Sequence, residues 1–287
     1  MGCKNCMKKI LAVIYVVIIV CIFISGCYHN EMDKPAEAND YGVFIGADPE
    51  VSKRFTGYST VIIDAQYYTA EDISELKEQG TTIYTYLNIG SLEDFREYYD
   101  VYEPITLDEY ENWNGERWVD VTEPVWRTFI SAKADELLDK GVDGFFVDNC
   151  DVYYHYHTEE VFENIAAILN DLKSKGAYVL VNGGDIFVTE YLSRYGNLDA
   201  VLDGVNQESV YTSVDGDDGS FTINDRDTRD YFLNYLSTVM KAGRDAYVIE
   251  YVSDQRTADE AKALADKYGY TVYVSYSLDL NGGKQND

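Results

Sequence analysis

The stretch LLDKGVDGFFVDN, residues 137–149, joins the end of a predicted helix to a short apolar strand. Gly141 can adopt the left-handed conformation that ends a helix, and Lys140 suits the negative end of the helix dipole. The strand that follows contains Phe and Val, which are common in strands buried on both faces. It ends on Asp148 and Asn149, which places an acid and an amide at the edge of an apolar core.

The same order of helix, glycine and apolar strand recurs along the chain. It predicts strands over residues 41–47, 59–65, 81–90, 142–149, 177–184, 200–208, 246–252 and 270–277. It predicts helices over residues 71–79, 124–140, 158–175, 185–195, 226–242 and 257–268, and about one helical turn within 49–57. Strands alternating with helices in this way indicate a (β/α)8 TIM-type barrel, a single domain over residues 41–280. A doubly wound open sheet is the alternative, but no GxGxxG loop follows the first strand.

The first 27 residues have the features of a bacterial lipoprotein signal peptide. Lys8 and Lys9 precede an apolar run, residues 10–24, which is short for a membrane-spanning helix but suits a secretory signal. Small residues before Cys27 resemble a lipobox, so we expect cleavage there and lipidation of Cys27. An uncleaved anchor is the alternative. Either way, we expect the domain at the cell surface, held to the membrane by its N-terminus.

The remaining parts of the chain outside the barrel are short. Residues 28–40 are polar and unpatterned and are interpreted as a tether, and residues 281–287 as a C-terminal tail. Outside the predicted signal peptide the chain has one cysteine, Cys150. We therefore expect no intrachain disulfide in the mature protein, whose core must hold the fold unaided. We expect a monomer.

The chain is strongly acidic. It has 23 Lys and Arg against 51 Asp and Glu, a formal net charge of −28, and its first 27 residues hold none of the acids. Nucleic acid is excluded as an expected partner because phosphate binding needs a basic face. An anionic membrane surface would repel the domain, which leaves the lipid as its membrane contact. A cationic polysaccharide substrate is compatible with this charge, although from charge alone ordinary acidic solubility is the better explanation.

Polar side chains end most of the predicted strands. The carboxyl ends of barrel strands meet at one mouth, where the active sites of TIM barrels lie. The polar residues there form a ring of acids and amides without Lys or Arg, although each one alone would also suit a helix cap. Its members are Asp64, Asn88, Asp148, Asn149, Asn182, Asn206, Gln207, Glu208 and Glu250.

Paired carboxyl groups on one face are what cleavage of a glycosidic bond needs, because one donates a proton while the other is ionised. Burial and like charge separate the pKa values of such a pair. Tyrosine is frequent, at 27 residues, and many tyrosines lie near strand ends, where they suit contacts with sugars, although aromatic residues are more often core. The long segment 91–123 is expected to form a lid or cleft wall.

Other chemistries find less support. A zinc site would use His or Cys, and His155 and His157 have no third ligand at the usual spacing, so we interpret them as solvated residues before a helix. Asp148, Asp151 and Glu208 could hold Ca²⁺ or Mg²⁺, but no spaced loop motif supports this. A catalytic serine would need a GxSxG motif, which is absent from the sequence, and Cys150 has no evident catalytic partner. We expect no metal and no cofactor.

Three motifs resemble those of a known family. YLNIGSLEDFR (86–96), WVDVTEPVWR (118–127) and GVDGFFVDNCD (141–151) are similar to the endo-α-1,4-polygalactosaminidases, glycoside hydrolase family 114. The resemblance extends from about Tyr41 to Tyr276 and is looser after residue 210, and segment 212–224 has no counterpart in it. It implies a (β/α)8 barrel that hydrolyses α-linked galactosamine polymers with two carboxyl groups.

The resemblance also implies the roles of individual residues. Asp148 would be the nucleophile or charge stabiliser, and Glu208 the general acid/base. Arg96 would pair with an acid of its own loop rather than contact sugar. Together with the polar ring, the resemblance predicts these substrate-binding residues: Asp64, Tyr86, Asn88, Asn149, Asp151, Asn182 and Glu250.

We therefore predict a surface-anchored glycoside hydrolase that cleaves an α-linked amino-sugar polysaccharide of the galactosamine type within the chain. One alternative is a polysaccharide-binding lipoprotein on the same barrel without catalysis, and another is an enzyme acting on peptidoglycan or a further hexosamine glycan. The distance between the carboxyl groups of Asp148 and Glu208 discriminates hydrolysis from binding alone. About 5–5.5 Å fits retention and about 6.5–9.5 Å inversion, whereas a much larger gap favours binding alone.

Overall fold

The structure of the protein, a computed structural model, describes residues 39–52, 55–110, 114–215 and 219–282. The predicted signal peptide with Cys27, most of the predicted tether and most of the C-terminal tail lie outside the described residues. Within those residues, no helix has both the length and the apolar character needed to cross a membrane.

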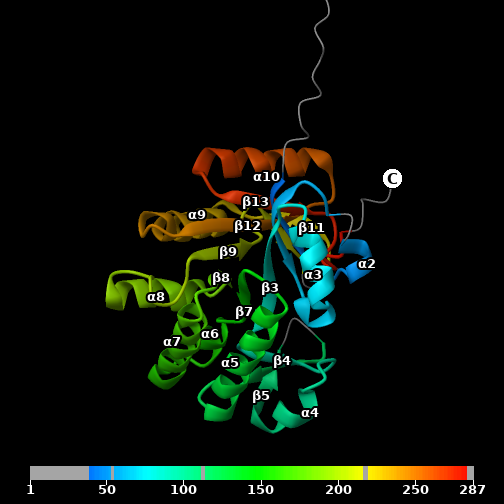
Figure 1. Cartoon of the computed structure of the whole chain (residues 1–287). Coiled ribbons are helices and arrows are strands. Elements are labelled where there is room, and N and C mark those ends of the chain that lie inside the picture. Colours follow the sequence, from blue (N-terminus) through cyan, green and yellow to red (C-terminus); the bar gives the residue numbers. More distant parts are fainter. Residues whose placement is uncertain (1–38, 53–54, 111–113, 216–218, 283–287) are drawn as a thin grey trace, which may run out of the picture. The chain divides into compact units, whose positions relative to one another are not determined.

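The apolar stretches of the sequence form one sheet in which all hydrogen-bonded neighbours are parallel (Figure 1). Its first and last strands, β1 and β13, contact each other, so the sheet forms a nearly closed barrel. This confirms the predicted (β/α)8 TIM-type fold. In spatial order the strands are β1 (Asn39–Phe44), β2 (Tyr58–Ile63), β3 (Thr82–Asn88), β7 (Gly144–Asp148), β8 (Tyr178–Asn182), β9 (Gly204–Glu208), β12 (Asp245–Tyr251) and β13 (Thr271–Ser275).

Helices connect successive strands and follow one another around the outside of the barrel (Figure 1). The Thr158 side chain accepts the Val161 N–H at 3.2 Å and starts α7, and left-handed Gly269 ends α10. Each predicted helix is present, with ends within about two residues of those expected. The helices are α2 (Pro49–Ser52), α3 (Ala70–Lys77), α5 (Pro124–Asp139), α6 (Val152–His155), α7 (Glu159–Ser174), α8 (Asp185–Tyr195), α9 (Arg226–Lys241) and α10 (Gln255–Tyr268), with a 3-10 turn η1 (Ala65–Tyr67) after β2.

The alternation of side chains along the strands divides the core into two clusters. On β7, Phe145 and Val147 pack outward against the helices, whereas Phe146 packs inside the barrel with Ile62, Leu180 and other inward residues. Successive side chains of a strand point to opposite faces, so the residue two positions after Phe146 also points inward. That residue is Asp148, which continues the interior of the barrel to its mouth.

The segment 91–123 forms a small antiparallel sheet, in the order β4-β6-β5, instead of a bare loop. We call it the added sheet. Its elements are β4 (Ser91–Glu93), α4 (Tyr99–Tyr102), η2 (Glu103–Ile105), β5 (Thr106–Glu109) and β6 (Glu116–Val119). The sheet sits on the end of β3 because the Val119 N–H donates to the Gly90 oxygen at 2.9 Å. Gly90 must be glycine, since a Cβ there would lie 1.8 Å from the backbone oxygen of Asn149.

The segment 212–224 forms a hairpin of β10 (Thr212–Val214) and β11 (Phe221–Ile223). The Phe221 ring packs against Tyr251 at the end of β12, with ring centroids 5.8 Å apart. The segment that lacked a family counterpart therefore reaches the mouth of the barrel.

Candidate active site

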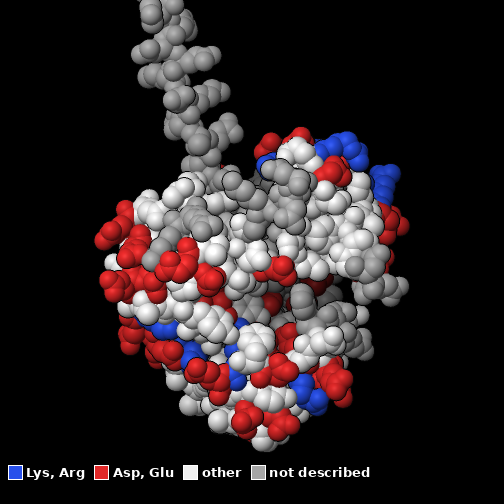
Figure 2. Space-filling model, turned by 90° about the vertical axis from the view of Figure 1, so that its right-hand side faces the viewer, with Lys and Arg blue, Asp and Glu red and all other residues white. Residues whose placement is uncertain are grey.

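Three polar residues end three neighbouring strands at the barrel mouth. Asp148 is the last residue of β7, Asn182 of β8 and Glu208 of β9. Figure 2 shows the side of the molecule on which α2 and β11 lie in Figure 1. Asp and Glu side chains predominate there over Lys and Arg, and some lie inside a hollow of the surface.

One amide group connects the two carboxyl groups. The Asn182 Nδ2 donates to Asp148 Oδ1 at 3.0 Å and to Glu208 Oε1 at 2.8 Å. These two bond lengths set an upper bound of about 6 Å on the distance between the two acceptor oxygens, as hydrogen-bond geometry requires. Asp148 and Glu208, distant in the chain, thus face each other across one side chain.

The orientation of this amide is itself determined by hydrogen bonds. The Asn182 oxygen accepts from Asn206 Nδ2 at 2.6 Å, and the Asn206 oxygen accepts from Tyr41 Oη at 3.1 Å. The Asn182 side chain therefore has its NH₂ group toward the carboxyl pair and its oxygen toward the interior of the barrel.

The second oxygen of each carboxyl group lies within hydrogen-bond distance of a tyrosine hydroxyl. Tyr86 Oη lies 3.1 Å from Asp148 Oδ2, and Tyr251 Oη donates to Glu208 Oε2 at 2.7 Å. Both tyrosines are buried. Each carboxyl group is consequently held from two sides on rigid strands, with little rotational freedom.

Electrostatics favour the protonated form of Asp148 in the empty site. Burial, followed by the charge of Glu208, raises the pKa of Asp148 to about 8, although the hydrogen bond from Asn182 opposes the shift. Like charges this close oppose the ionisation of both groups, which is the condition that separates an acid from a base. Near neutral pH Asp148 is then mostly protonated.

This raised pKa predicts a fold whose stability falls as pH rises. The folded state binds the Asp148 proton more tightly than the unfolded chain, so its contribution is complete below pH 3.8 and is lost as pH rises through about 8. Thermal unfolding followed from pH 5 to about 9 should show a falling melting temperature. Asp148→Asn, which stays neutral, should flatten that fall and be more stable than the natural protein above pH 8. Equal pH slopes in the two proteins would contradict this assignment.

The chain turns sharply directly after each carboxylate. Asn149 and Ser209 follow Asp148 and Glu208, and both have left-handed backbones, with φ of 64° and 57°. This conformation costs free energy in residues other than glycine, and residues that adopt it are enriched at functional sites. The Asn149 side chain then points to the added sheet, where its Nδ2 donates to Ser91 Oγ at 2.8 Å and to Glu116 Oε1 at 3.0 Å.

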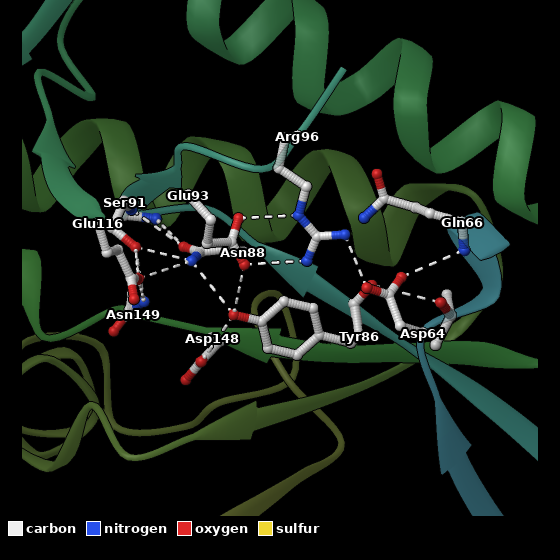
Figure 3. A network of polar contacts seen from close by, with 12 residues as sticks. Asp64, Gln66, Tyr86, Asn88, Ser91, Glu93, Arg96, Glu116, Asp148 and Asn149 are labelled. Atoms are coloured by element: carbon white, nitrogen blue, oxygen red, sulfur yellow. Dashed lines mark hydrogen bonds and ion pairs between the residues drawn. The ribbon is translucent and has the colours of Figure 1, made fainter. Parts of the chain in front are cut away.

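A second layer of charge lies behind Tyr86 (Figure 3). Arg96 donates from Nε and Nη2 to the two oxygens of Glu93, at 3.0 and 2.9 Å, and from Nη1 to Asp64 Oδ2 at 2.7 Å. The side chain of Arg96 is 4 % exposed. As the sequence predicted, Arg96 pairs with an acid of its own loop, and it also holds Asp64.

A cluster around Glu116 joins the added sheet to the barrel. Asn88 Nδ2 donates to Ser91 Oγ at 2.7 Å and to Tyr86 Oη at 3.2 Å, and Ser91 Oγ donates to Glu116 Oε1. Burial raises the pKa of Glu116. Sequence reasoning did not select Glu116, because nothing in its local sequence shows that β6 folds back over the strand ends.

Two residues predicted to bind substrate have other contacts. Asp151 accepts the backbone N–H of Gly184 at 3.1 Å, and burial raises its pKa to about 6. Glu250 is fully buried, and its carboxylate accepts the N–H groups of Tyr211 and Thr212 at 2.7 and 2.9 Å. Glu250 thus holds the start of the β10–β11 hairpin and does not join the other predicted residues. The structure brings together Asp148, Glu208, Asn182, Tyr86, Asn88 and Asn149, with Asp64 behind them.

His155 and His157 lie on the exposed surface, at the end of α6 and just after it. The His155 ring packs on Trp118 with centroids 4.5 Å apart, and His157 Nε2 lies 3.2 Å from Tyr153 Oη. In the described ranges, no group of three or more His, Cys, Asp or Glu side chains is arranged to hold a metal ion.

Comparison with known proteins agrees with this architecture. The glycoside hydrolase domain of PelA from Pseudomonas aeruginosa superposes with a TM-score of 0.70, at 24 % identity, over 84 % of this chain and 96 % of that domain. Ega3 from Aspergillus fumigatus, solved in complex with galactosamine, superposes with a TM-score of 0.67, at 14 % identity, over 86 % of this chain and 94 % of that one. At these identities the likeness supports the barrel fold.

Relatives in sequence include an uncharacterized protein of Methanocaldococcus jannaschii, 25 % identical over 234 residues. The match covers 73 % of this chain and 65 % of that protein, so the chain spans less than two thirds of the relative. The family model of glycoside hydrolase family 114 matches residues 28–285, which includes every strand of the barrel. The chain belongs to glycoside hydrolase family 114.

Proposed function

We propose that the protein cleaves an α-linked amino-sugar polysaccharide of the galactosamine type within the chain, with Asp148 and Glu208 as its carboxyl pair. The observation that carries this proposal is the Asn182 amide that donates to both carboxyl groups. It brings the two acids within reach of one glycosidic bond at the mouth of a barrel, where TIM-barrel chemistry takes place.

The short distance favours a double displacement. An upper bound of about 6 Å between the facing oxygens leaves little room for a water molecule between carboxylate and sugar, which inversion would need. Asp148 would attack the anomeric carbon while Glu208 protonates the leaving oxygen. Glu208 would then deprotonate the water that releases the sugar from Asp148, which completes the cycle with the anomeric configuration retained.

The proton of the pair must be on Glu208 during this reaction, whereas the raised pKa of Asp148 places it on Asp148 in the empty site. The ammonium group of a bound amino sugar near the pair would favour the ionised form of Asp148. Substrate binding thus shifts the proton toward Glu208. The Asn182 amide has one N–H for each carboxyl group, so it can donate to both acids whichever of them holds the proton.

The charge of the protein supports a cationic substrate. The formal net charge is −28, and acids predominate at the face with the hollow (Figure 2). A partly deacetylated amino-sugar polymer carries ammonium groups that such a field attracts. Ega3, which shares the fold, binds galactosamine in its solved complex. We further propose that Cys27 carries a lipid that holds the enzyme at the cell surface.

Incubation with a panel of hexosamine polymers tests the substrate class. Partly deacetylated α-linked galactosamine polymer should give a rapid rise in reducing ends and a fall in polymer length, with new ends released as α-anomers. Fully acetylated polymer, glucosamine polymer and peptidoglycan form the comparison arms. Fastest cleavage of peptidoglycan would replace the galactosamine assignment. Saturable binding without any new reducing ends would support the polysaccharide-binding lipoprotein instead.

A further inference from the structure

Tyr86 lies between two carboxyl groups but has one proton to donate. Its Oη is 3.1 Å from Asp148 Oδ2 and 3.2 Å from Glu93 Oε1, and it accepts a bond from Asn88 Nδ2 at 3.2 Å. The tyrosine is 8 % exposed, so surrounding water is largely excluded. The phenol hydrogen must therefore point either to Asp148 or to Glu93.

Arg96 fixes Glu93 in a position from which it can accept this hydrogen. Both of its oxygens are bound by Arg96, in a bidentate pair whose side chains are 4 % and 8 % exposed. Asp64 holds the third guanidinium nitrogen at 2.7 Å. Figure 3 shows Arg96 between Glu93 and Asp64, with Tyr86 reaching toward Asp148. The position of the Glu93 oxygen does not depend on Tyr86, since Arg96 fixes it.

We propose that Glu93 is a positioning residue that acts on Asp148 through Tyr86, whose hydrogen turns between the two carboxyl groups as Asp148 gains and loses charge. When Asp148 is ionised, the Tyr86 hydrogen points to it. When Asp148 is protonated, or is esterified to sugar in the proposed reaction, the hydrogen turns to Glu93. The proton stays on the phenol oxygen throughout, so no bond to it is broken.

This arrangement deepens the proposed function, on which it rests, because it gives the Tyr86 hydroxyl a hydrogen-bond acceptor in each state that a double displacement requires. A charged nucleophile is a strong acceptor for the Tyr86 hydrogen, whereas the carbonyl oxygen of its ester is neutral and a weaker one. The Glu93 carboxylate offers the buried Tyr86 hydroxyl a stronger acceptor in the ester state.

Other groups also act on Asp148, and the inference concerns only the part that passes through Tyr86. Glu93 reaches Asp148 through Tyr86. The titratable groups that interact electrostatically with Asp148 are Tyr86, Tyr110, Glu116, Cys150, Asp151, Glu208 and Tyr251.

The direction of each substitution follows from the geometry. Glu93→Gln weakens the competing acceptor and removes a nearby negative charge, so ionised Asp148 gains the Tyr86 hydrogen and its pKa falls. Tyr86→Phe removes a donor to ionised Asp148, and a charge-assisted bond is the stronger of the two that Tyr86 can make with it. The pKa of Asp148 should then rise.

Titration of the Asp148 carboxyl group in the substrate-free protein tests the inference. Aspartate labelled with ¹³C at its side-chain carboxyl gives a resonance for Asp148 that is identified by its loss in Asp148→Asn. Glu93→Gln should lower the midpoint of that resonance by about one pH unit or more, because ionised Asp148 then receives the Tyr86 hydrogen without competition, and a hydrogen bond to the charged form lowers the pKa of an acid. Tyr86→Phe should raise it. In the double variant Tyr86→Phe/Glu93→Gln, the lowering caused by Glu93→Gln should shrink to less than half.

Asp64→Asn is the matched control, since it removes the other carboxylate on Arg96, and the hydrogen bonds of Asp64 come from Arg96 and the Gln66 N–H, not from Tyr86. An equal shift with Asp64→Asn and Glu93→Gln, or an undiminished Glu93→Gln effect without the phenol, would overturn the inference. If Glu93→Gln does not fold, an unchanged midpoint in Tyr86→Phe alone would overturn it. Because no substrate is used, this result and the loss of hydrolysis in Asp148→Asn can fail separately.

Discussion

Asp148→Asn and Glu208→Gln should each lower hydrolysis of the true substrate by several orders of magnitude and leave a folded protein. Each change preserves shape and removes one carboxyl group of the pair that Asn182 connects. General acid–base catalysis alone contributes about 10²- to 10⁴-fold, and loss of the nucleophile removes the covalent route altogether. Reducing-end release by the purified variants measures the effect, with circular dichroism as the check of folding.

Asp139→Asn is the control for these variants, because it makes the same chemical change on the exposed surface of α5. It should keep full activity. Near-normal turnover in either Asp148→Asn or Glu208→Gln would show that the pair is not catalytic.

The two variants should also separate the roles of the acids. A substrate with an aryl leaving group needs no proton to depart, so Glu208→Gln should recover much of the first step with it, whereas Asp148→Asn should not. Recovery in Asp148→Asn but not in Glu208→Gln would exchange the two roles. Asp148 would then be the acid, a role that fits its raised pKa in the empty site.

Arg96→Met should have the largest effect on stability. Arg96 is the shared partner of Glu93 and Asp64, and all three side chains are at most 8 % exposed. Burial raises the pKa of Asp64 by more than Arg96 lowers it, so the pKa is raised even with the guanidinium present. Without the guanidinium, two buried carboxylates lose their cation, and breaking a buried pair in this way costs about 3–5 kcal/mol. Chemical denaturation should show this loss in the free energy of unfolding.

Arg127→Met is the matched control. Arg127 also makes a bidentate pair, with Asp171 at 2.6 and 2.8 Å, but its side chain is 43 % exposed. Exposed pairs contribute about 0–1 kcal/mol. The triple variant Arg96→Met/Glu93→Gln/Asp64→Asn should regain part of the stability, since no buried charge then lacks a partner. Similar losses for Arg96→Met and Arg127→Met would contradict a buried charge network.

Most of the barrel is predictable from local sequence. Left-handed glycines end helices, as Gly269 does, and side-chain caps begin them, as Thr158 does, because these signals act within a few residues. Segment 91–123 is different. Its strands β4, β5 and β6 are short and pair with each other, so their order depends on contacts that no single window of sequence contains.

The end of β12 shows why part of the site was missed. Glu250 looked like a member of the polar ring, but it faces outward, whereas the adjacent Tyr251 faces inward and donates to Glu208. Alternate residues of a barrel strand point into the barrel and toward the helices, and both faces are buried. The alternation of polar and apolar residues therefore does not reveal which set of alternate residues points inside. The register of β12 against β9 decides it.

The sequence by itself determined the repeating strand–helix order, the acidic charge and the carboxylates Asp148 and Glu208 at strand ends, because these depend on residue type and short spacing. The tertiary structure alone decided that Asn182 connects the two acids, that Tyr86 joins Asp148 to Glu93, and that Arg96 holds Asp64. Such contacts join residues far apart in the chain. Barrel closure and strand register bring them together, and neither quantity is a property of any local segment.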